Sequence, residues 1–497
     1  MLYIRTDFSS PRNILSTSCL SAKLIAVFIR CYNETGRIRA MAQETKTRAL
    51  NRLKSMYALR AEVDKMYQGG VEAEQEGKPV AWVMLEGWAN PILNAMDVKT
   101  VYPENYSSVC AATGTATPFL ERAEAEGYPS HLCGYARTCV GYSATMMDLD
   151  GAIPPEAPAG GMPKPTLLVG SGAVCDARFK WFQSLGRYFD APVWTLEQPS
   201  PGARERLAEG AYERNVNFLI KELKAFVAFL EKLLGKKMDW DKLNFTGGGT
   251  NEINRLRWEI NELRKARPGP MHTRDFWSAM SAALYRGAAD PKVIIDGHQK
   301  MYDEVKGRVD NGVAAINREE RYRLSFEGLP PWHSLGFLED LADRGWNFVI
   351  ESAYSPQRPL NRDLSQYSDP MEIYVRTRYR SIDETIEEEY GPEDAEEIKQ
   401  EIRQTGTSRR LGLRHIREYH VDGAILHVLL TCRSQSAGLS LLQDRMLDVL
   451  KVPCLVMEGD IIDTSLFNPA DALRKAEAFE ETMDHYRKVR KELGMPW

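Results

Sequence analysis

The residues with the clearest chemical potential in this 497-residue chain are cysteines. The chain has eight, and five of them lie near the ends of expected helices or strands, where thiols from distant segments could meet: Cys110, Cys133, Cys139, Cys175 and Cys432. Thiolates are soft ligands that select zinc or an iron–sulfur cluster over hard cations. Histidines are scarce near these cysteines, which makes a mixed Cys/His zinc site the less attractive of the two.

The spacing of these cysteines does not match that of a zinc ribbon or a ferredoxin. The chain has no CxxC pair, and the candidate ligands are separated by long intervals that carry little local information. Eight cysteines in so long a chain also do not make a disulfide scaffold. Buried free thiols in a reducing compartment therefore remain the alternative to a shared metal site.

Several of these residues follow expected strands, which is where ligands bind in open α/β sheets. Glu104 follows the strand expected at 98–102, and Cys175 follows the strand expected at 166–169. Cys432 ends the strand expected at 423–431, and Asp460 follows the next strand. Cys175 is also expected to open a helix, where the dipole and free N–H groups stabilise a thiolate.

The elements that must position these residues form two α/β units. The expected strands are 80–85, 98–102, 166–169 and 192–196 in the first unit, and 322–326, 346–350, 423–431 and 453–457 in the second. Between the units, from about 203 to 311, apolar residues recur at helical spacing. We therefore predict an α/β protein with two Rossmann-like parallel-sheet domains and a helical middle segment.

The pattern places domain limits at 79–202 for the first α/β domain, 203–320 for the helical segment and 321–497 for the second α/β domain. Residues 41–78 are expected to form an amphipathic helical arm or clamp. Residues 1–40 differ in composition from the rest and make a poor signal peptide, so we expect an extension that is disordered or not translated, with Met41 as the start.

Other motifs are weaker. Residues 382–401 are strongly acidic and are expected to form a solvated helix or excursion, with a docking surface as the second interpretation. The basic residues Arg409, Arg410, Arg414 and Arg417 could neutralise them. The segment Thr246-Gly-Gly-Gly-Thr250 is expected to break one helix and cap the next rather than to cradle phosphate.

Charge and composition exclude some functions. The net charge of −5 and the lack of a basic run argue against a nucleic-acid partner. No run of about 18 apolar residues occurs, so no membrane span is expected. The partial Gly170-Ser-Gly172 motif gives little support for dinucleotide binding, and no P-loop motif is present.

Four segments in order along the chain resemble one known family. They are PENY at 103–106, CGYAR at 133–137, LLVGSGAVCDARFKWFQSLGRYFDAPVW at 167–194 and DGAILHVLLTCRSQSAGLSLLQDRMLDVLKVPCLVMEGDIID at 422–463. Together they resemble the 2-hydroxyacyl-CoA dehydratase family, which also contains the subunits of ATP-dependent benzoyl-CoA reductases.

The resemblance implies a subunit built around a 4Fe-4S cluster with Cys133, Cys175 and Cys432 as ligands, and with Cys110 as a less secure ligand. Three thiolates leave one iron free for a thioester carbonyl or hydroxyl. It further implies a related second subunit in a heterodimer or larger assembly, and a separate ATP-hydrolysing activator that donates the electron. The enzyme would be cytoplasmic and oxygen-sensitive.

The implied reaction adds one electron to a CoA-thioester carbonyl to give a ketyl radical. In a dehydratase this expels the 2-hydroxyl, whereas an aryl-CoA reductase dearomatises a ring. Glu104 is the expected catalytic carboxylate that handles the proton, although it could be a helix-start carboxylate. Asn105 and Arg137 are expected to bind the substrate, or to hold the local turn. The alternative from a different class is a non-catalytic scaffold with the same fold and no cluster.

Overall fold

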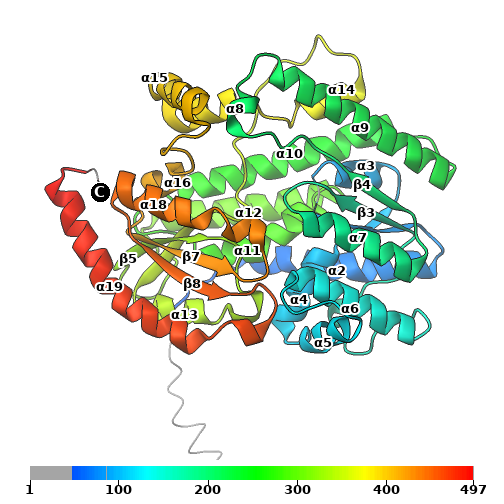
Figure 1. The fold of residues 1–497 in the computed structure, drawn as a ribbon, viewed down its shortest axis with the longest axis horizontal. Coiled ribbons are helices and arrows are strands. Elements are labelled where there is room, and N and C mark those ends of the chain that lie inside the picture. The colour runs from blue at the N-terminus through cyan, green and yellow to red at the C-terminus, as the bar shows by residue number, and fades with distance from the viewer. Residues whose placement is uncertain (1–47, 86, 496) are drawn as a thin grey trace, which may run out of the picture. The chain divides into compact units, whose positions relative to one another are not determined.

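The computed structural model describes residues 48–85, 87–495 and 497 (Figure 1). The expected extension at 1–40 and the expected start at Met41 lie outside these residues. Residues 49–497 form one compact unit, so the domain limits expected from the sequence remain predictions.

The first sheet contains four parallel strands in the order β2-β1-β3-β4. These strands are β1 (Val80–Val83), β2 (Lys99–Val101), β3 (Leu167–Ser171) and β4 (Val193–Leu196). Every residue of β1 and β3 is buried, as expected when helices cover both faces of a parallel sheet. The strand order reverses between β1 and β3, so their carboxyl ends border a crevice where ligands bind in such sheets.

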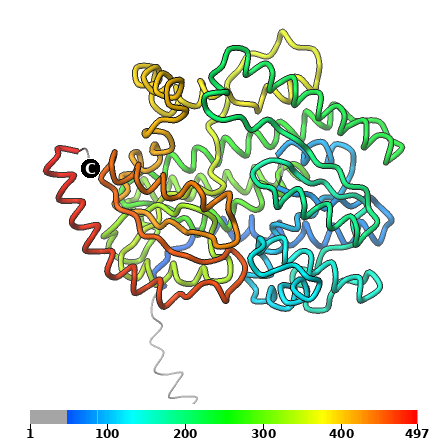
Figure 2. The backbone as a smooth tube through the Cα atoms, viewed as in Figure 1, coloured from blue at the N-terminus to red at the C-terminus, as the bar shows by residue number. Residues whose placement is uncertain are grey.

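The second sheet repeats this order as β6-β5-β7-β8, again with all strands parallel. Its strands are β5 (Tyr322–Glu327), β6 (Trp346–Glu351), β7 (Gly423–Leu429) and β8 (Cys454–Gly459). The predicted α/β fold with two parallel sheets is confirmed, and all eight expected strands are present within a few residues of their expected limits. Figure 2 traces the chain through the first sheet in blue to green and through the second in yellow-green to orange.

The helices of the two α/β units connect the strands and cover the sheets. They are α3 (Ala89–Ala95), α4 (Pro103–Thr113), α5 (Thr117–Ala125), α6 (Gly134–Asp148), α7 (Asp176–Phe189), α13 (Phe337–Asp343), α14 (Pro370–Arg376), α16 (Arg414–Glu418), α17 (Arg433–Ser436), α18 (Leu439–Leu450) and α19 (Pro469–Glu492). The helix α7 packs against β3, and α19 packs against β8 (Figure 1). The helix α2 (Ser55–Gln75) is amphipathic and buries its apolar side in the main core.

The helical middle segment consists of α8 (Ala203–Arg206), α9 (Ala211–Leu234), α10 (Trp240–Leu263), α11 (Thr273–Ser281), the π-helix η2 (Ala282–Arg286) and α12 (Pro291–Asp310). One expectation for this segment is wrong, because α10 continues through the glycine triplet at 247–249. A Cβ at Gly249 would lie 2.2 Å from the Pro291 side chain, and one at Gly247 would lie 3.4 Å from the Tyr374 ring. The glycines therefore allow close packing of neighbouring elements and do not end the helix.

The acidic stretch forms the helix α15 (Ile382–Thr405), which is kinked at Gly391. A capping box between Ser381 and Glu384 begins it. Five of its apolar side chains form a small core of their own, so it is more than a solvated excursion. Of the four basic residues expected to neutralise it, Arg410 forms ion pairs with its carboxylates, whereas Arg409 and Arg414 form ion pairs with acidic residues outside the stretch.

Candidate thiol site and the adjoining cavity

Three of the predicted cysteines precede helices directly. Cys133 is the N-cap residue of α6, Cys175 that of α7, and Cys432 that of the single-turn helix α17. The backbone N–H groups of Tyr135 and Ala136 lower the pKa of Cys133, and that of Arg178 lowers the pKa of Cys175, although burial outweighs both. Each sulfur therefore lies at the start of a helix, where free N–H groups favour the thiolate form.

Burial opposes this effect. Desolvation raises the pKa of Cys133 to about 12, and the nearby charges of Cys432 and Asp460 add to the increase. Desolvation also raises the pKa of Cys175, while the Arg178 backbone N–H and guanidinium charge oppose it. Burial outweighs the Arg178 charge, so both sulfurs are favoured as neutral thiols at pH 7.

The structure brings these three cysteines into one neighbourhood. The charge of Cys432 acts on both Cys133 and Cys175. The residues that directly follow Cys432 and Cys175 form an ion pair, with 2.9 Å between Arg433 Nη2 and Asp176 Oδ2. Cys175 and Cys432 also occupy equivalent places, because each follows the third strand of its sheet.

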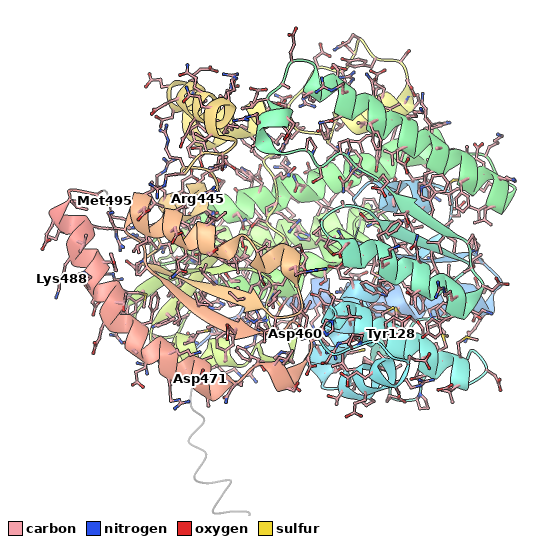
Figure 3. All side chains as sticks on the ribbon, in the orientation of Figure 1. Tyr128, Arg445, Asp460, Asp471, Lys488 and Met495 are labelled. Atoms are coloured by element: carbon pink, nitrogen blue, oxygen red, sulfur yellow. The ribbon has the colours of Figure 1, made fainter. Side chains whose placement is uncertain are left out.

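Asp460, directly after β8, connects the Cys133 and Cys432 segments. Its carboxylate accepts a hydrogen bond from Thr431, the neighbour of Cys432, and bonds of 2.9 and 2.8 Å from the N–H groups of Ile462 and Asp463. Gly134, the neighbour of Cys133, packs directly on it, since a Cβ there would lie 2.6 Å from Asp460 Oδ1. Figure 3 labels Asp460 at this junction. The sequence indicated its place after a strand but not this role.

The donor chemistry of these thiols fits an iron–sulfur cluster, because soft thiolate sulfur is the ligand that such clusters take. Within the described ranges, however, no three His, Cys, Asp or Glu side chains are grouped closely enough to hold a metal ion. The assignment of Cys133, Cys175 and Cys432 as cluster ligands therefore stays a prediction.

Cys110 lies elsewhere, on α4 and fully inside the core. Burial raises its pKa to about 12. Its charge acts on Cys139 and on the buried hydroxyls of Tyr67, Tyr106 and Tyr142. These contacts place it in the packing between α4 and α6, and its role as a less secure ligand also stays a prediction.

Glu104 lies in the first turn of α4, beside the thiols. Its carboxylate is 3.4 Å from Arg178 Nη2, which also donates to the Leu85 carbonyl over 2.5 Å. The Glu104 charge is one of the causes that raise the pKa of Cys175. Arg178 thus connects the predicted catalytic carboxylate, the Cys175 segment and the end of β1.

Asn105 and Arg137, the predicted substrate-binding residues, are engaged by the protein itself. The Asn105 Oδ1 accepts from the Tyr67 hydroxyl over 2.8 Å, and its Nδ2 donates to Ser281 over 3.2 Å. Arg137 is buried and donates to Glu124 and Asp463, at 2.6 Å each. These bonds agree with the alternative that both residues hold the local structure, and their substrate contacts stay a prediction.

A group of aromatic side chains that sequence reasoning missed lies on the other side of Glu104. Trp332 Nε1 donates to the Tyr135 hydroxyl over 2.6 Å, and burial followed by the Tyr135 and Glu104 charges raises the pKa of Tyr354. Burial, followed by the Glu104 charge, raises the pKa of Tyr135. Tyr354 has a left-handed backbone with φ of 66°, an unfavourable conformation for this residue type. No local motif indicates this group, because its members come from three distant segments.

A cavity of about 520 Å³ adjoins this group. Its wall includes Leu85 and Trp88 after β1, Tyr354 after β6, and residues of α10 and η2. Leu85 and Tyr354 therefore belong both to the cavity wall and to the contacts around Glu104. The volume is typical of a site for a small organic ligand.

None of the helices in the described part of the chain combines the length and apolar character needed to cross a membrane.

Comparison with known proteins gives consistent matches over most of the chain. The family model for the 2-hydroxyglutaryl-CoA dehydratase D-component matches residues 89–483. The α subunit of (R)-2-hydroxyisocaproyl-CoA dehydratase from Clostridioides difficile is 23% identical over 430 residues, covering 86% of this chain and 95% of the relative. The α subunit of (R)-2-hydroxyglutaryl-CoA dehydratase from Acidaminococcus fermentans is 22% identical, covering 86% and 96%. A benzoyl-CoA reductase subunit from Thauera aromatica is 24% identical, covering 83% and 91%.

Proposed function

This chain belongs to the 2-hydroxyglutaryl-CoA dehydratase D-component family, and from that membership we propose that it is the iron–sulfur subunit of an enzyme acting on a CoA thioester. The reaction is either dehydration of a 2-hydroxyacyl-CoA or reduction of an aryl-CoA ring, since relatives named for both activities match the chain. The single observation that carries the proposal is that Cys133, Cys175 and Cys432 each begin a helix and that the charge of Cys432 acts on both of the others.

The residues of this chain would have separate tasks. A 4Fe-4S cluster held by Cys133, Cys175 and Cys432 would supply low-potential electrons and an open coordination position. Glu104 would accept or donate the substrate proton. Arg178 would hold Glu104 toward Leu85 at the cavity wall. The apolar part of the cavity wall would exclude water from the reacting carbonyl.

The proposal includes partners. The relatives are named as individual subunits of dehydratases and of a reductase, which implies enzymes of more than one subunit. We therefore propose a related second subunit, and a separate ATP-hydrolysing activator as electron donor, for a cytoplasmic, oxygen-sensitive enzyme. The chain carries no P-loop motif of its own, which agrees with ATP hydrolysis on another chain.

One observation favours a second candidate function. The described part of the chain contains no preformed group of three metal-ligating side chains. The same would be expected of a scaffold homologue that keeps the fold and lacks a cluster. This candidate and the enzyme differ in a property that can be measured directly, namely bound iron.

The deciding experiment is anaerobic purification followed by iron analysis and visible absorption spectroscopy. The enzyme should bind about four irons per chain, the number in a 4Fe-4S cluster, and Cys133→Ala, Cys175→Ala and Cys432→Ala should each lower that content. The matched control is Cys454→Ala, because this half-buried thiol lies in β8 beside Met446. Iron-free wild-type protein would support the scaffold, whereas iron that survives all three substitutions would refute the assignment of these cysteines as ligands. Anaerobic turnover with 2-hydroxyacyl-CoA and benzoyl-CoA would separate the two reactions.

A further inference from the structure

The cavity beside Glu104 has an unbalanced charge. None of the described lining residues is an Asp or a Glu. Four arginines lie along the wall, namely Arg257, Arg358, Arg378 and Arg380. A guanidinium that is removed from water needs a counter-charge or a full set of acceptors to offset its desolvation. The partners of each arginine therefore indicate which charges are left for a ligand.

Arg257 is the innermost of these charges. It is 7% exposed, and its one hydrogen bond runs from Nη2 to the Tyr354 carbonyl over 2.6 Å. Its Nε and Nη1 have no hydrogen-bond acceptor among the described residues. Burial lowers its pKa to about 10, with a nearby Glu351 charge opposing that decrease, so it stays cationic at pH 7. The cavity wall thus contains a buried cation with unused donors.

Arg378 and Arg358 add two further charges without a carboxylate partner. Arg378 donates to the carbonyls of Gly87 and Gly247 and to the hydroxyls of Thr250 and Tyr374, all of which are neutral. These bonds fix its guanidinium but leave its charge uncompensated. Arg358 is exposed, and its side chain has no partner among the residues described.

Arg380 differs, because it forms an ion pair with Glu388 of α15. The acidic helix therefore neutralises one of the four arginines and leaves the other three charged.

Asn90 gives an independent indication of a ligand. Its side chain is 4% exposed and lines the cavity. The amide nitrogen donates to the Leu284 carbonyl over 3.2 Å, which fixes the orientation of the group. Its Oδ1 has no hydrogen-bond partner among the described residues. A buried acceptor of this kind costs free energy unless a bound molecule or water donates to it.

We infer that this cavity is an anion-recognition site in which Arg257, Arg358 and Arg378 bind negatively charged groups of the ligand, while Asn90 accepts a hydrogen bond from it. The inference rests on the proposed function for the identity of the ligand as an acyl-CoA. The shared chemistry is an oxyanion, supplied either by the CoA phosphates or by a carboxylate at the far end of the acyl group. Guanidinium groups recognise both through paired N–H donors.

Calorimetric titration of the anaerobically purified full chain tests this inference. The probes are CoA, 3′-dephospho-CoA, pantetheine and inorganic pyrophosphate. Arg257→Gln, Arg358→Gln and Arg378→Gln should weaken CoA binding, each buried position by roughly 10- to 150-fold, the effect of losing a hydrogen bond to a charged group. Pantetheine, which lacks phosphate, should bind equally weakly to all variants. The control is the paired change Lys306→Gln with Asp310→Asn, an exposed ion pair of α12 that does not line the cavity, which should alter CoA affinity by less than about 3-fold because it removes no net charge.

Glutaryl-CoA and butyryl-CoA, which carry no 2-hydroxyl, separate the two sources of negative charge. If phosphates are bound, the three substitutions weaken both thioesters equally. If a carboxylate is bound, Arg257→Gln removes a preference for glutaryl-CoA, and either result upholds the inference. Unchanged affinity for both CoA and glutaryl-CoA in the combined three-arginine variant would overturn it.

The outcome is distinguishable from that of the proposed function. An iron-free chain that binds pyrophosphate through Arg378 would uphold the anion site and refute the iron–sulfur enzyme. A chain with iron and turnover whose affinities for CoA and glutaryl-CoA are both unchanged by loss of the three arginines would refute the anion site and uphold the enzyme. Circular dichroism of each variant ensures that lost binding is not lost folding.

Discussion

Replacing Gly134 with alanine should disturb the thiol site through a single methyl group. Gly134 follows Cys133 at the start of α6, and its added Cβ would lie 2.6 Å from Asp460 Oδ1 and 3.0 Å from Ile462 Cβ. Asp460 cannot turn away freely, because its carboxylate also accepts hydrogen bonds from Thr431 and from two backbone N–H groups. The start of α6 must therefore move away from the β8 loop, and Cys133 must move with it.

The size of the effect follows from overpacking and from helix propensity. Forcing a methyl group into a packed contact costs about 1–3 kcal/mol, whereas Gly→Ala in a helix without such a contact stabilises by about 1 kcal/mol. Gly307, in α12, provides that reference, since a Cβ there would meet nothing within 4 Å. Both variants gain the propensity term, so the free energies of unfolding of Gly134→Ala and Gly307→Ala should differ by about 1–3 kcal/mol, the overpacking cost.

Urea unfolding measures that difference, and iron analysis of anaerobically purified protein measures the consequence for the thiols. Gly134→Ala should lose iron, while Gly307→Ala should retain the wild-type content. If the two variants unfolded at the same urea concentration and held equal iron, the close packing of α6 on Asp460 would not position Cys133, and the reasoning would be refuted.

Three further predictions concern buried charges. Arg137→Leu removes the buried partner of Asp463. It should lower the free energy of unfolding, measured with urea, by about 3–5 kcal/mol. A decrease of less than about 1 kcal/mol would contradict the ion pair. Glu327 raises the pKa of His415 against the effect of burial, and His415 lowers that of Glu327, again against burial. The stability that this pair contributes should be greatest between about pH 5 and 6.5. It should be lost as pH rises through the folded pKa of His415 or falls through that of Glu327. If the change in the free energy of unfolding caused by His415→Asn did not vary with pH, the prediction would be refuted. Glu104→Gln should lower kcat by about 10²- to 10⁴-fold with iron content and CoA affinity unchanged, and full activity would remove Glu104 from proton transfer.

The sheets could be predicted from the sequence because buried parallel strands are short apolar runs between breakers. All eight runs expected as strands are strands, and Cys175 and Cys432 follow strands as expected. The glycine triplet in α10 was interpreted wrongly, since composition alone cannot show that Pro291 and Tyr374 need the space that glycine leaves. Local sequence gives the type of an element but not what will pack against it.

The cavity could not be predicted for a related reason. Arg257, Arg358 and Arg378 are distant in sequence, and each looks like an ordinary surface arginine until the fold places them around one space. The contact between Trp332 and Tyr135 joins residues 197 positions apart. Such convergence depends on the tertiary structure. The thiols could be identified from the sequence because cysteine is a rare residue in this chain.

The repeated strand order of the two sheets also bears on how the protein is made. Cys175 follows the third strand of one sheet and Cys432 the third strand of the other, so the thiol neighbourhood needs both halves of the molecule. During synthesis the ribosome releases the first two sulfurs long before the third, and the set cannot be completed until the second sheet has folded. A cofactor held by these three thiols would therefore be loaded only at the final stage of the chain's maturation.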